Sequence, residues 1–352
     1  MKLKMCYLCY LIAFLFLLSG IALSAPQKPS TTAEIAVYKG ADRQQILEEG
    51  AKKEGKLTLY TVEILAQTLR PKLEIFKKKY SFIKVDVWRA PDLRVTSRLF
   101  EEYKAGRKIV DVICTTQAGV MVIEQMKILQ AYYSPNVAHI EDAAIKMGPD
   151  GTGYSAGFYE SIRGIGYNPS LIGKNQVPKT YQELLDPKWK GKLAIAGSMS
   201  GVGWMGTILE TFGEKFVEQL ARQDFDVHMV SARALLDMVI AGEYMFSPTI
   251  SNSHVFVSKQ KGATAEWVPI EPAHAHLVQI MLPESPPNIH AALLFIDFNL
   301  SKEVGEMHIA NGYGSPRKDL GRSVVYKRGY GPYSRNQLTT WKKMFDKLFL
   351  TK

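Results

Sequence analysis

The chain has 352 residues, of which 46% are hydrophobic and 22% are charged, and its formal net charge at pH 7 is +10. This composition is ordinary for a folded, soluble protein, and the length exceeds that of a single compact core, so we expect two lobes. The excess positive charge attracts acidic ligands or an anionic membrane face, or else forms a solvated surface. Nucleic-acid binding is disfavoured, because the chain has no arginine-rich run and no aromatic stacking motif.

The N-terminus predicts a cleavable signal peptide over residues 1–24. Lys2 and Lys4 precede an apolar run over residues 11–23, and small residues follow it. A basic start, a short apolar middle and a small-residue end are the three parts of a secretory leader. An uncleaved membrane anchor is the alternative, which the length of the run disfavours, since a span needs roughly 20 apolar residues. We therefore expect export to the periplasm.

Removal of this leader changes the charge and the cysteine content. The leader carries two lysines and two of the three cysteines, so the formal charge falls to +8 and only Cys114 remains. One cysteine cannot form an internal disulfide, and the exported fold must therefore depend on its hydrophobic core.

After the leader, the first half of the chain alternates between helical and strand patterns. Helices are predicted over 43–53, 68–80 and 92–105, and strands over 56–61, 83–88 and 109–114. The last strand is an almost continuous apolar run interrupted by Asp111, which suits a buried parallel strand. Alternation at this spacing is typical of α/β proteins with a mostly parallel sheet.

The second half begins with a segment that is long enough to run between two lobes, residues 158–167. Thr180 and Glu183 form a predicted capping box at the start of a short helix. A strand is predicted over 193–196, and helices over 201–212, 232–241, 291–300 and near 341–350. We assign 25–157 with 270–320 to one α/β lobe, 158–269 to a second α/β lobe, and 321–352 to a helical tail packed on the lobes. Open α/β sheets bind ligands beyond the carboxyl ends of their strands.

The loop Gly197–Gly203 connects a predicted strand to a predicted helix. It lacks the lysine and hydroxyl residue that follow the last glycine of a nucleotide-binding P-loop. A helix start offers free N–H groups and a positive dipole end to an anion, and Ser198, Ser200 and Gly201 stand there. A plain turn with capping serines is the alternative. Trp204 either stacks on a ligand or packs inside the lobe.

Many segments, in the same order, resemble the extracellular solute-binding proteins of ABC importers, in the ferric-iron-type branch. They are EGKLTLYT, FKKKYSFIKVDVWRA, SRLFEEYKAGRKIVDVICTT, GIGYNPSL, PKTYQELLDPKWKGKLAI, IAGEYMF, PNIHAALLFIDFNLS and GYGSPRKDLG. The resemblance covers residues from about 45 to about 320. It implies a two-lobed type 2 periplasmic-binding fold, with a ligand cleft between the lobes. It also implies delivery of cargo to a membrane permease rather than catalysis.

The metal site of the ferric-binding members does not carry over to this chain. Those proteins hold iron with two adjacent tyrosines, whereas the corresponding segment here, residues 248–256, reads PTISNSHVF. The loop 114–117 contains no acid either. Ferric iron therefore stays an alternative cargo rather than the expected one.

Five candidate ligand contacts follow the strands of the first lobe. Thr61 and Glu63 follow the first strand, Arg89 ends the second, and Thr115 and Thr116 follow the third. A guanidinium can bind a carboxylate or phosphate through two hydrogen bonds. The alternatives are a helix-capping role for Glu63 and a surface ion pair for Arg89.

Five further candidates belong to the crossing segment and the second lobe. Tyr159 and Arg163 lie on the crossing, where an interlobe salt bridge is the alternative for Arg163. Asn252, Ser253 and His254 occupy the place of the tyrosine pair and suit a polar organic ligand.

Two other kinds of site deserve a test. His274 and His276 have strand spacing and point to one face, and with His254 they offer three nitrogens to a metal, although packed or exposed histidines are commoner. Cys114 suggests a thiaminase-like enzyme on the same fold. No base or positive group adjoins it in sequence, so a buried structural cysteine is expected.

We therefore expect a monomeric periplasmic protein that captures a small anionic or polar organic solute by hinge closure and delivers it to an ABC permease. No cofactor, catalytic residue or metal site is expected. The alternatives are transport of ferric iron or another metal, sensing through a membrane receptor, and catalysis through Cys114.

Overall fold

The computed structural model describes residues 28–271, 273–321 and 335–351, and the predicted signal peptide lies outside these ranges. Its first part is an α/β unit whose parallel strands are β1 (Lys56–Thr61), β2 (Lys84–Arg89) and β3 (Val112–Thr116), with β1 in the centre. The helices around them are α2 (Thr32–Val37), α3 (Arg43–Glu54), α4 (Arg70–Lys79), α5 (Asp92–Lys104), α6 (Gln117–Gln125), α11 (Ile289–Asn299) and α12 (Lys302–Ala310). The predicted helices and strands of this half are confirmed to within a few residues.

The third strand begins at Val112, later than predicted, and Asp111 just before it binds two other segments through its side chain. Its buried carboxylate accepts hydrogen bonds from Thr58 N at 2.7 Å, Asn288 N at 2.7 Å and Asn288 Nδ2 at 2.9 Å. Burial raises the pKa of Asp111, and the three N–H donors oppose that rise. The acid that interrupts the apolar run therefore ties β1 to the start of α11.

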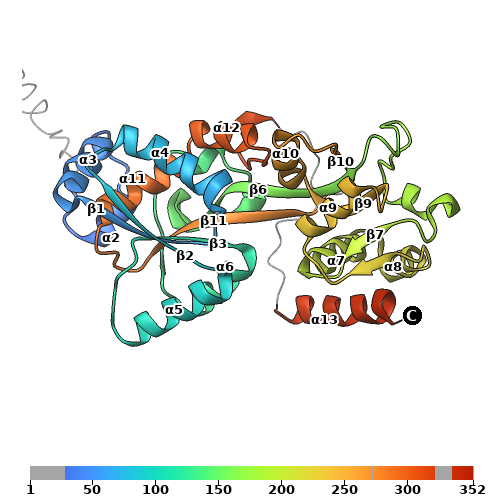
Figure 1. Cartoon of the computed structure of the whole chain (residues 1–352). Coiled ribbons are helices and arrows are strands. Elements are labelled where there is room, and N and C mark those ends of the chain that lie inside the picture. The colour runs from blue at the N-terminus through green and yellow to red at the C-terminus, as the bar shows by residue number, and fades with distance from the viewer. Residues whose placement is uncertain (1–27, 272, 322–334, 352) are drawn as a thin grey trace, which may run out of the picture.

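Two long strands connect this unit to the rest of the chain. They are β6 (Gly153–Tyr167) and β11 (Ala275–Pro283), which pair antiparallel to each other. In the described residues the main sheet has the order β10-β6-β11-β3-β1-β2, and the short strands β4 (Leu129–Gln130), β5 (Ile145–Met147) and β9 (Phe246–Ser251) join it off this path. Figure 1 shows β6 and β11 crossing the middle of the molecule from one half to the other.

The second part is built on the far ends of these crossing strands. Strands β9 and β10 (Glu266–Pro269) pair with β6, while β7 (Ala194–Ala196) and β8 (Asp226–His228) form a separate parallel pair. Its helices are α7 (Met199–Phe212), α8 (Glu214–Ala221), α9 (Ala232–Ala241) and α10 (Asn252–Gln260). The predicted capping box forms only in part. Glu183 N donates to Thr180 Oγ1 at 3.3 Å, but the Glu183 carboxylate accepts from Lys179 N at 2.9 Å. The helix that follows is a short 3-10 helix over Gln182–Leu185 whose N-cap is Tyr181.

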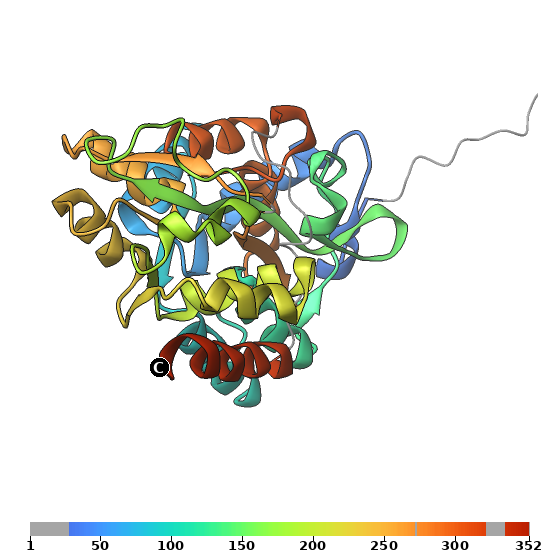
Figure 2. The ribbon, with the colours of Figure 1, turned by 90° about the vertical axis from the view of Figure 1, so that its right-hand side faces the viewer.

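Each part has its own hydrophobic core. The larger core collects residues from 35 to 162 and from 273 to 313, and another core collects residues from 165 to 270 and from 341 to 349. Helix α13 (Arg335–Phe345) packs along α7 (Figure 2). Its residues Trp341 and Phe345 belong to the second core. The chain thus forms two α/β lobes, and the exact lobe boundaries stay a prediction.

No helix within the described ranges is both long enough and apolar enough to span a bilayer.

Candidate functional site

The parallel strands of the first lobe end at one edge. Thr61 is the register partner of both Arg89 on β2 and Cys114 on β3, and β3 continues into Thr115 and Thr116. The carboxyl ends of neighbouring parallel strands meet in this way, and ligands of open α/β sheets bind beyond them. Four of the five first-lobe candidates are therefore brought together at this edge, and the fifth, Glu63, lies just past it.

The polar groups of this edge largely bind one another. Thr61 Oγ1 donates to Glu63 Oε1 at 3.2 Å, and Arg89 Nε donates to the Glu63 carbonyl at 2.5 Å. Lys72 Nζ lies 2.6 Å from Glu63 Oε1, and neither side chain has any solvent exposure. Lys72 also donates to Asn299 Oδ1 at 2.5 Å. Glu63 is thus the centre of a buried polar network, a role that neither of its sequence interpretations described.

The two threonines after β3 are held by Asp92, the first residue of α5. Asp92 accepts hydrogen bonds from Thr116 N and Thr116 Oγ1, both at 3.0 Å, and from Thr115 Oγ1. This contact fixes the start of α5 beside the end of β3. Asp92 was not among the sequence candidates, although an acid in the first turn after a strand–proline junction is a recognisable signal.

The second group surrounds Arg163 on the crossing strand β6. Its Nη2 donates to Ser200 Oγ at 3.0 Å, and its backbone N donates to the His274 carbonyl at 2.8 Å. Ser200 lies in the first turn of α7, where the N-cap Ser198 accepts from Ser200 N at 3.4 Å. A buried guanidinium therefore stands at the start of a 14-residue helix, where the dipole end is also positive.

Three histidines lie in the electric field of Arg163. Burial and then Arg163 lower the pKa of His276 to about 3 and that of His254 to about 4, and the same two causes hold the pKa of His274 well below its usual range. All three imidazoles are therefore neutral at pH 7. His276 is exposed to solvent on one side, and the protein atoms around it still desolvate its imidazole.

His274 joins the crossing strands to α7. Its Nδ1 lies 2.7 Å from Thr207 Oγ1, and a Cβ on Gly203 would come within 3.0 Å of its Nε2. The rings of His274 and His276 are 5.5 Å apart. From the sequence, His274 and His276 are candidates for a metal site only. The fold places both imidazoles close enough to Arg163 for its charge to lower their pKa.

Two α10 candidates lie beside this group, whereas Tyr159 packs in the core of the first lobe. Asn252 Oδ1 accepts from Ile162 N at 3.2 Å, and Ser253 Oγ lies 3.5 Å from Ser161 Oγ. Tyr159 is buried between the rings of His308, at 4.7 Å, and Tyr313, at 5.3 Å. Burial and then Glu63 raise the pKa of Tyr159 far above its usual range.

Strand β11 sets the spacing between the two groups. Val278 is the register partner of Thr116 in the first lobe, and His274, which contacts α7 in the second lobe, lies four residues earlier along the chain. Four residues of extended strand span about 13 Å. The two groups are therefore displaced from each other along the crossing strands.

In the loop Gly197–Gly203, the backbone of Gly201 lies close to the carbonyl of Ala196, and the tryptophan that follows the loop is buried. A Cβ on Gly201 would lie 1.9 Å from the Ala196 carbonyl, so only glycine fits where α7 leaves the strand. Trp204 has no solvent exposure and its ring lies 6.0 Å from Phe225 and 6.4 Å from Phe349. Trp204 therefore packs inside the second lobe, which is one of the two alternatives predicted from the sequence.

Cys114 has the environment of a structural cysteine. It is fully buried, and burial together with the Glu63 charge raises the pKa of its thiol well above its usual range. A nucleophilic cysteine needs the opposite shift. Among the described residues, no three His, Cys, Asp or Glu side chains are grouped in a way that could hold a metal ion.

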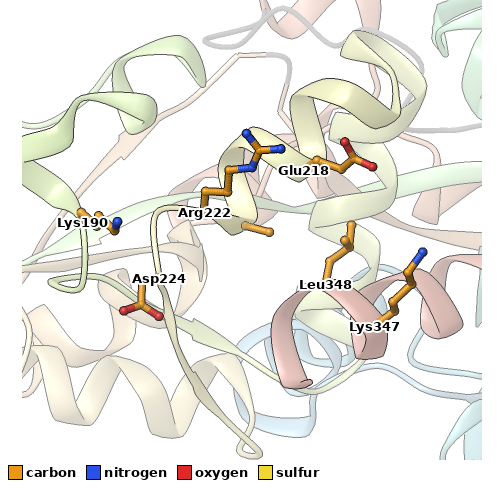
Figure 3. Close-up of a pocket in the computed structure, with 7 residues that line it drawn as sticks. Lys190, Glu218, Arg222, Asp224, Lys347 and Leu348 are labelled. Carbon is orange, nitrogen blue, oxygen red and sulfur yellow. The ribbon is translucent and has the colours of Figure 1, made fainter. Parts of the chain in front are cut away.

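A surface hollow of about 800 Å³ lies elsewhere, on the second lobe. Lys190, Glu218, Arg222, Asp224 and Lys347 line it, and they come from α8, the turns beside it and the C-terminal end (Figure 3). None of the predicted site residues belongs to it, and its mixed charges favour no single class of ligand.

Two α/β lobes joined by crossing strands, with a basic group at a helix start beside the crossing, define a two-lobed binding protein. The chain belongs to the bacterial extracellular solute-binding protein family, whose family model matches residues 107–328. The iron-bound HitA of Pseudomonas aeruginosa has the same type 2 periplasmic-binding fold, with a TM-score of 0.65 and 18% identity over 83% of this chain and 99% of that one. AfuA of Actinobacillus pleuropneumoniae, with fructose-6-phosphate bound, gives a TM-score of 0.61 and 20% identity over 85% of this chain and 100% of that one.

Curated relatives match a shorter part of the chain. "Iron uptake protein A1" of Synechocystis is 25% identical over 193 residues, which are 48% of this chain and 51% of that protein. An uncharacterized Haemophilus influenzae protein is 26% identical over 194 residues, 52% of this chain and 56% of that protein. The chain thus spans about half the length of the curated relatives it matches.

Proposed function

We propose that this solute-binding protein captures a small anionic or polar organic solute in the periplasm and delivers it, unchanged, to an ABC permease. The observation that carries the proposal is the Arg163–Ser200 contact at the start of α7. The three histidines around Arg163 are neutral at pH 7, so the positive charge of this group is that of Arg163. A positive field at a helix start favours a carboxylate or a phosphate.

The proposed mechanism is hinge closure about β6 and β11. These two strands are the long connections between the lobes, and they carry Arg163 and His276, while His274 directly precedes β11. A ligand that contacts both lobes binds the closed form better than the open form, and so it shifts the population toward closure. The permease then recognises the closed form.

Ferric iron is the second candidate cargo, because iron-bound HitA shares the fold and a curated relative bears the name of an iron uptake protein. The sequence supports the organic solute instead, since residues 248–256 contain no tyrosine to supply a phenolate. AfuA with fructose-6-phosphate bound illustrates that proteins of this fold also bind phosphorylated organic solutes.

A thermal-shift screen separates the two candidates. The panel contains carboxylates, phosphate esters and phosphonates in one arm, and ferric salts with and without citrate in the other. A ligand that binds only the native state raises the melting temperature with its concentration. A rise with organic anions in the absence of iron supports the proposal, whereas a rise with ferric iron alone overturns it.

A matched pair of variants then locates the site. Ser198→Ala/Ser200→Ala removes two hydroxyls at the start of α7, and we expect the affinity for the best anion to fall about tenfold or more, because hydrogen bonds to charged groups are worth about 1.5–3 kcal/mol. Ser170→Ala changes an exposed serine of the same lobe and should leave the affinity unchanged. Equal affinities in both variants would place the anion elsewhere.

A further inference from the structure

Exposed apolar side chains gather at the carboxyl ends of the parallel strands. Large apolar side chains with substantial exposure directly follow β1, β2, β7 and β8, and these are Ile64, Leu65, Leu93, Met199, Met229 and Val230. Leu93, at 75% exposure, and Met229, at 67%, are the most exposed large apolar residues among those described. Single exposed apolar residues are ordinary on a protein surface. Their concentration at the strand ends of both lobes is not, because that is where the fold binds its ligands.

Two methionines flank the helix start in the second lobe. Met229 lies against Gly197, since a Cβ on that glycine would come within 2.5 Å of the Met229 sulfur. Met199 is the first residue of α7 and is 52% exposed. The helix start that offers hydrogen bonds to an anion thus has an exposed methionine in its first turn and a second one against the preceding Gly197. Methionine is flexible and polarizable, so it adapts to apolar ligands of irregular shape.

The first lobe presents aliphatic groups at its own strand ends. Leu65 follows β1 with 48% exposure, and Leu93 follows β2. The backbone position of Leu93 is fixed, because the adjacent Asp92 binds Thr115 and Thr116 at the end of β3. An exposed leucine on an anchored turn faces water permanently unless another group covers it.

We propose that the solute carries an apolar body next to its anionic group, as an alkyl or aryl carboxylate or phosphonate does. Met199 and Met229 from the second lobe, and Leu65 and Leu93 from the first, cover that body when the lobes close. This inference rests on the proposed function and extends it from the anionic group to the rest of the ligand. Met199 lies in the same first turn of α7 as Ser200, which Arg163 contacts, so an amphiphilic small molecule matches the polar and apolar groups at this helix start.

The test measures how affinity depends on the length of the apolar body. Straight-chain carboxylates from acetate to octanoate, and methylphosphonate against phenylphosphonate, are titrated by calorimetry into the mature full chain. Each buried methylene should tighten binding about three- to fourfold, until the covered space is filled. Met199→Ser/Met229→Ser should flatten this dependence while the shortest anions keep their affinity.

Met147→Ser is the matched control, because Met147 is 52% exposed, like Met199, but belongs to β5. It should keep the full chain-length dependence. An equal dependence in the wild type and in the double methionine variant would overturn this inference and leave anion binding intact. Failure of every anion to bind would overturn the proposed function itself. Loss of import with unchanged binding in the double variant would show that the methionines contact the permease, which also overturns the inference.

Discussion

Arg163 on β6 donates a hydrogen bond to Ser200 on α7 at 3.0 Å, and so a strand that crosses between the lobes touches the start of a second-lobe helix. Burial first, and Arg163 next, lower the pKa of His254, His274 and His276, so this one side chain supplies a positive charge and also contributes to the neutral state of the histidines. The chemistry of the proposed anion site therefore depends on this residue more than on any other.

Replacing Arg163 by glutamine should weaken the binding of the best anion about ten- to a hundredfold. The variant removes the charge, and charge-assisted hydrogen bonds are about twice as strong as neutral ones. Calorimetric titration at low and high salt measures the effect. Arg222→Gln serves as the control, because Arg222 is an exposed arginine of the same lobe that lines only the outer hollow (Figure 3). Similar losses in both variants would indicate a general charge effect instead of a site.

Removing one partner of the buried pair of Lys72 and Glu63 should destabilise the first lobe strongly. Neither side chain is exposed, so Lys72→Met leaves the Glu63 carboxylate buried without its cation. Breaking a buried ion pair in this way costs about 3–5 kcal/mol of unfolding free energy. Urea unfolding followed by circular dichroism measures the loss. Lys72→Met/Glu63→Gln should lose less than the sum of the two single variants, since it leaves no isolated charge behind.

The exposed pair of Lys84 and Asp86 provides the comparison for that experiment. Their side chains are 77% and 53% exposed, so Lys84→Met should change the urea midpoint very little. Equal destabilisation by Lys84→Met and Lys72→Met would contradict the role we assign to the buried network.

Local patterns were enough to predict part of the helices and strands of this chain. Residues 56–61 and 232–241 form a strand and a helix with the predicted bounds, because alternation and capping residues are properties of contiguous sequence. The strand β11 was not predicted as a whole. Its nine residues are buried except for His276, and a long apolar run carries no period that separates a strand from a helix.

The candidate site was predictable only where it follows the strand ends. Thr61 and Arg89 are neighbours because consecutive parallel strands end together, which sequence reasoning anticipates. The contact of Lys72 with Asn299 joins residues 227 positions apart, and no local pattern specifies it. The effect of Arg163 on His276 likewise depends on the pairing of β6 with β11, which the sequence alone does not supply.

Cys114→Ala should leave ligand binding unchanged. The thiol is buried and burial raises its pKa, so at pH 7.5 it should react very slowly with a thiol reagent in the native state and rapidly in urea. Calorimetry on the variant and a thiol-labelling time course on the wild type measure the two effects. Product formation from any bound solute, abolished in Cys114→Ala, would restore the enzymatic alternative.

Stability should fall as the pH drops below 6.5, and His254 should account for part of the fall. Burial first, and Arg163 next, lower its folded-state pKa to about 4, whereas the unfolded chain has the usual value of about 6.5. Between these values the unfolded state binds the extra proton, so the stabilising contribution is complete above pH 6.5 and is lost on acidification. His254→Gln should therefore reduce the difference in unfolding free energy between pH 7.5 and pH 5 by about 2 kcal/mol.

Urea unfolding at the two pH values measures this difference. His139→Gln, at an exposed histidine, is the control and should behave as the wild type does. A wild-type pH dependence in the His254→Gln variant would show that His254 titrates normally and does not lie in the field of Arg163.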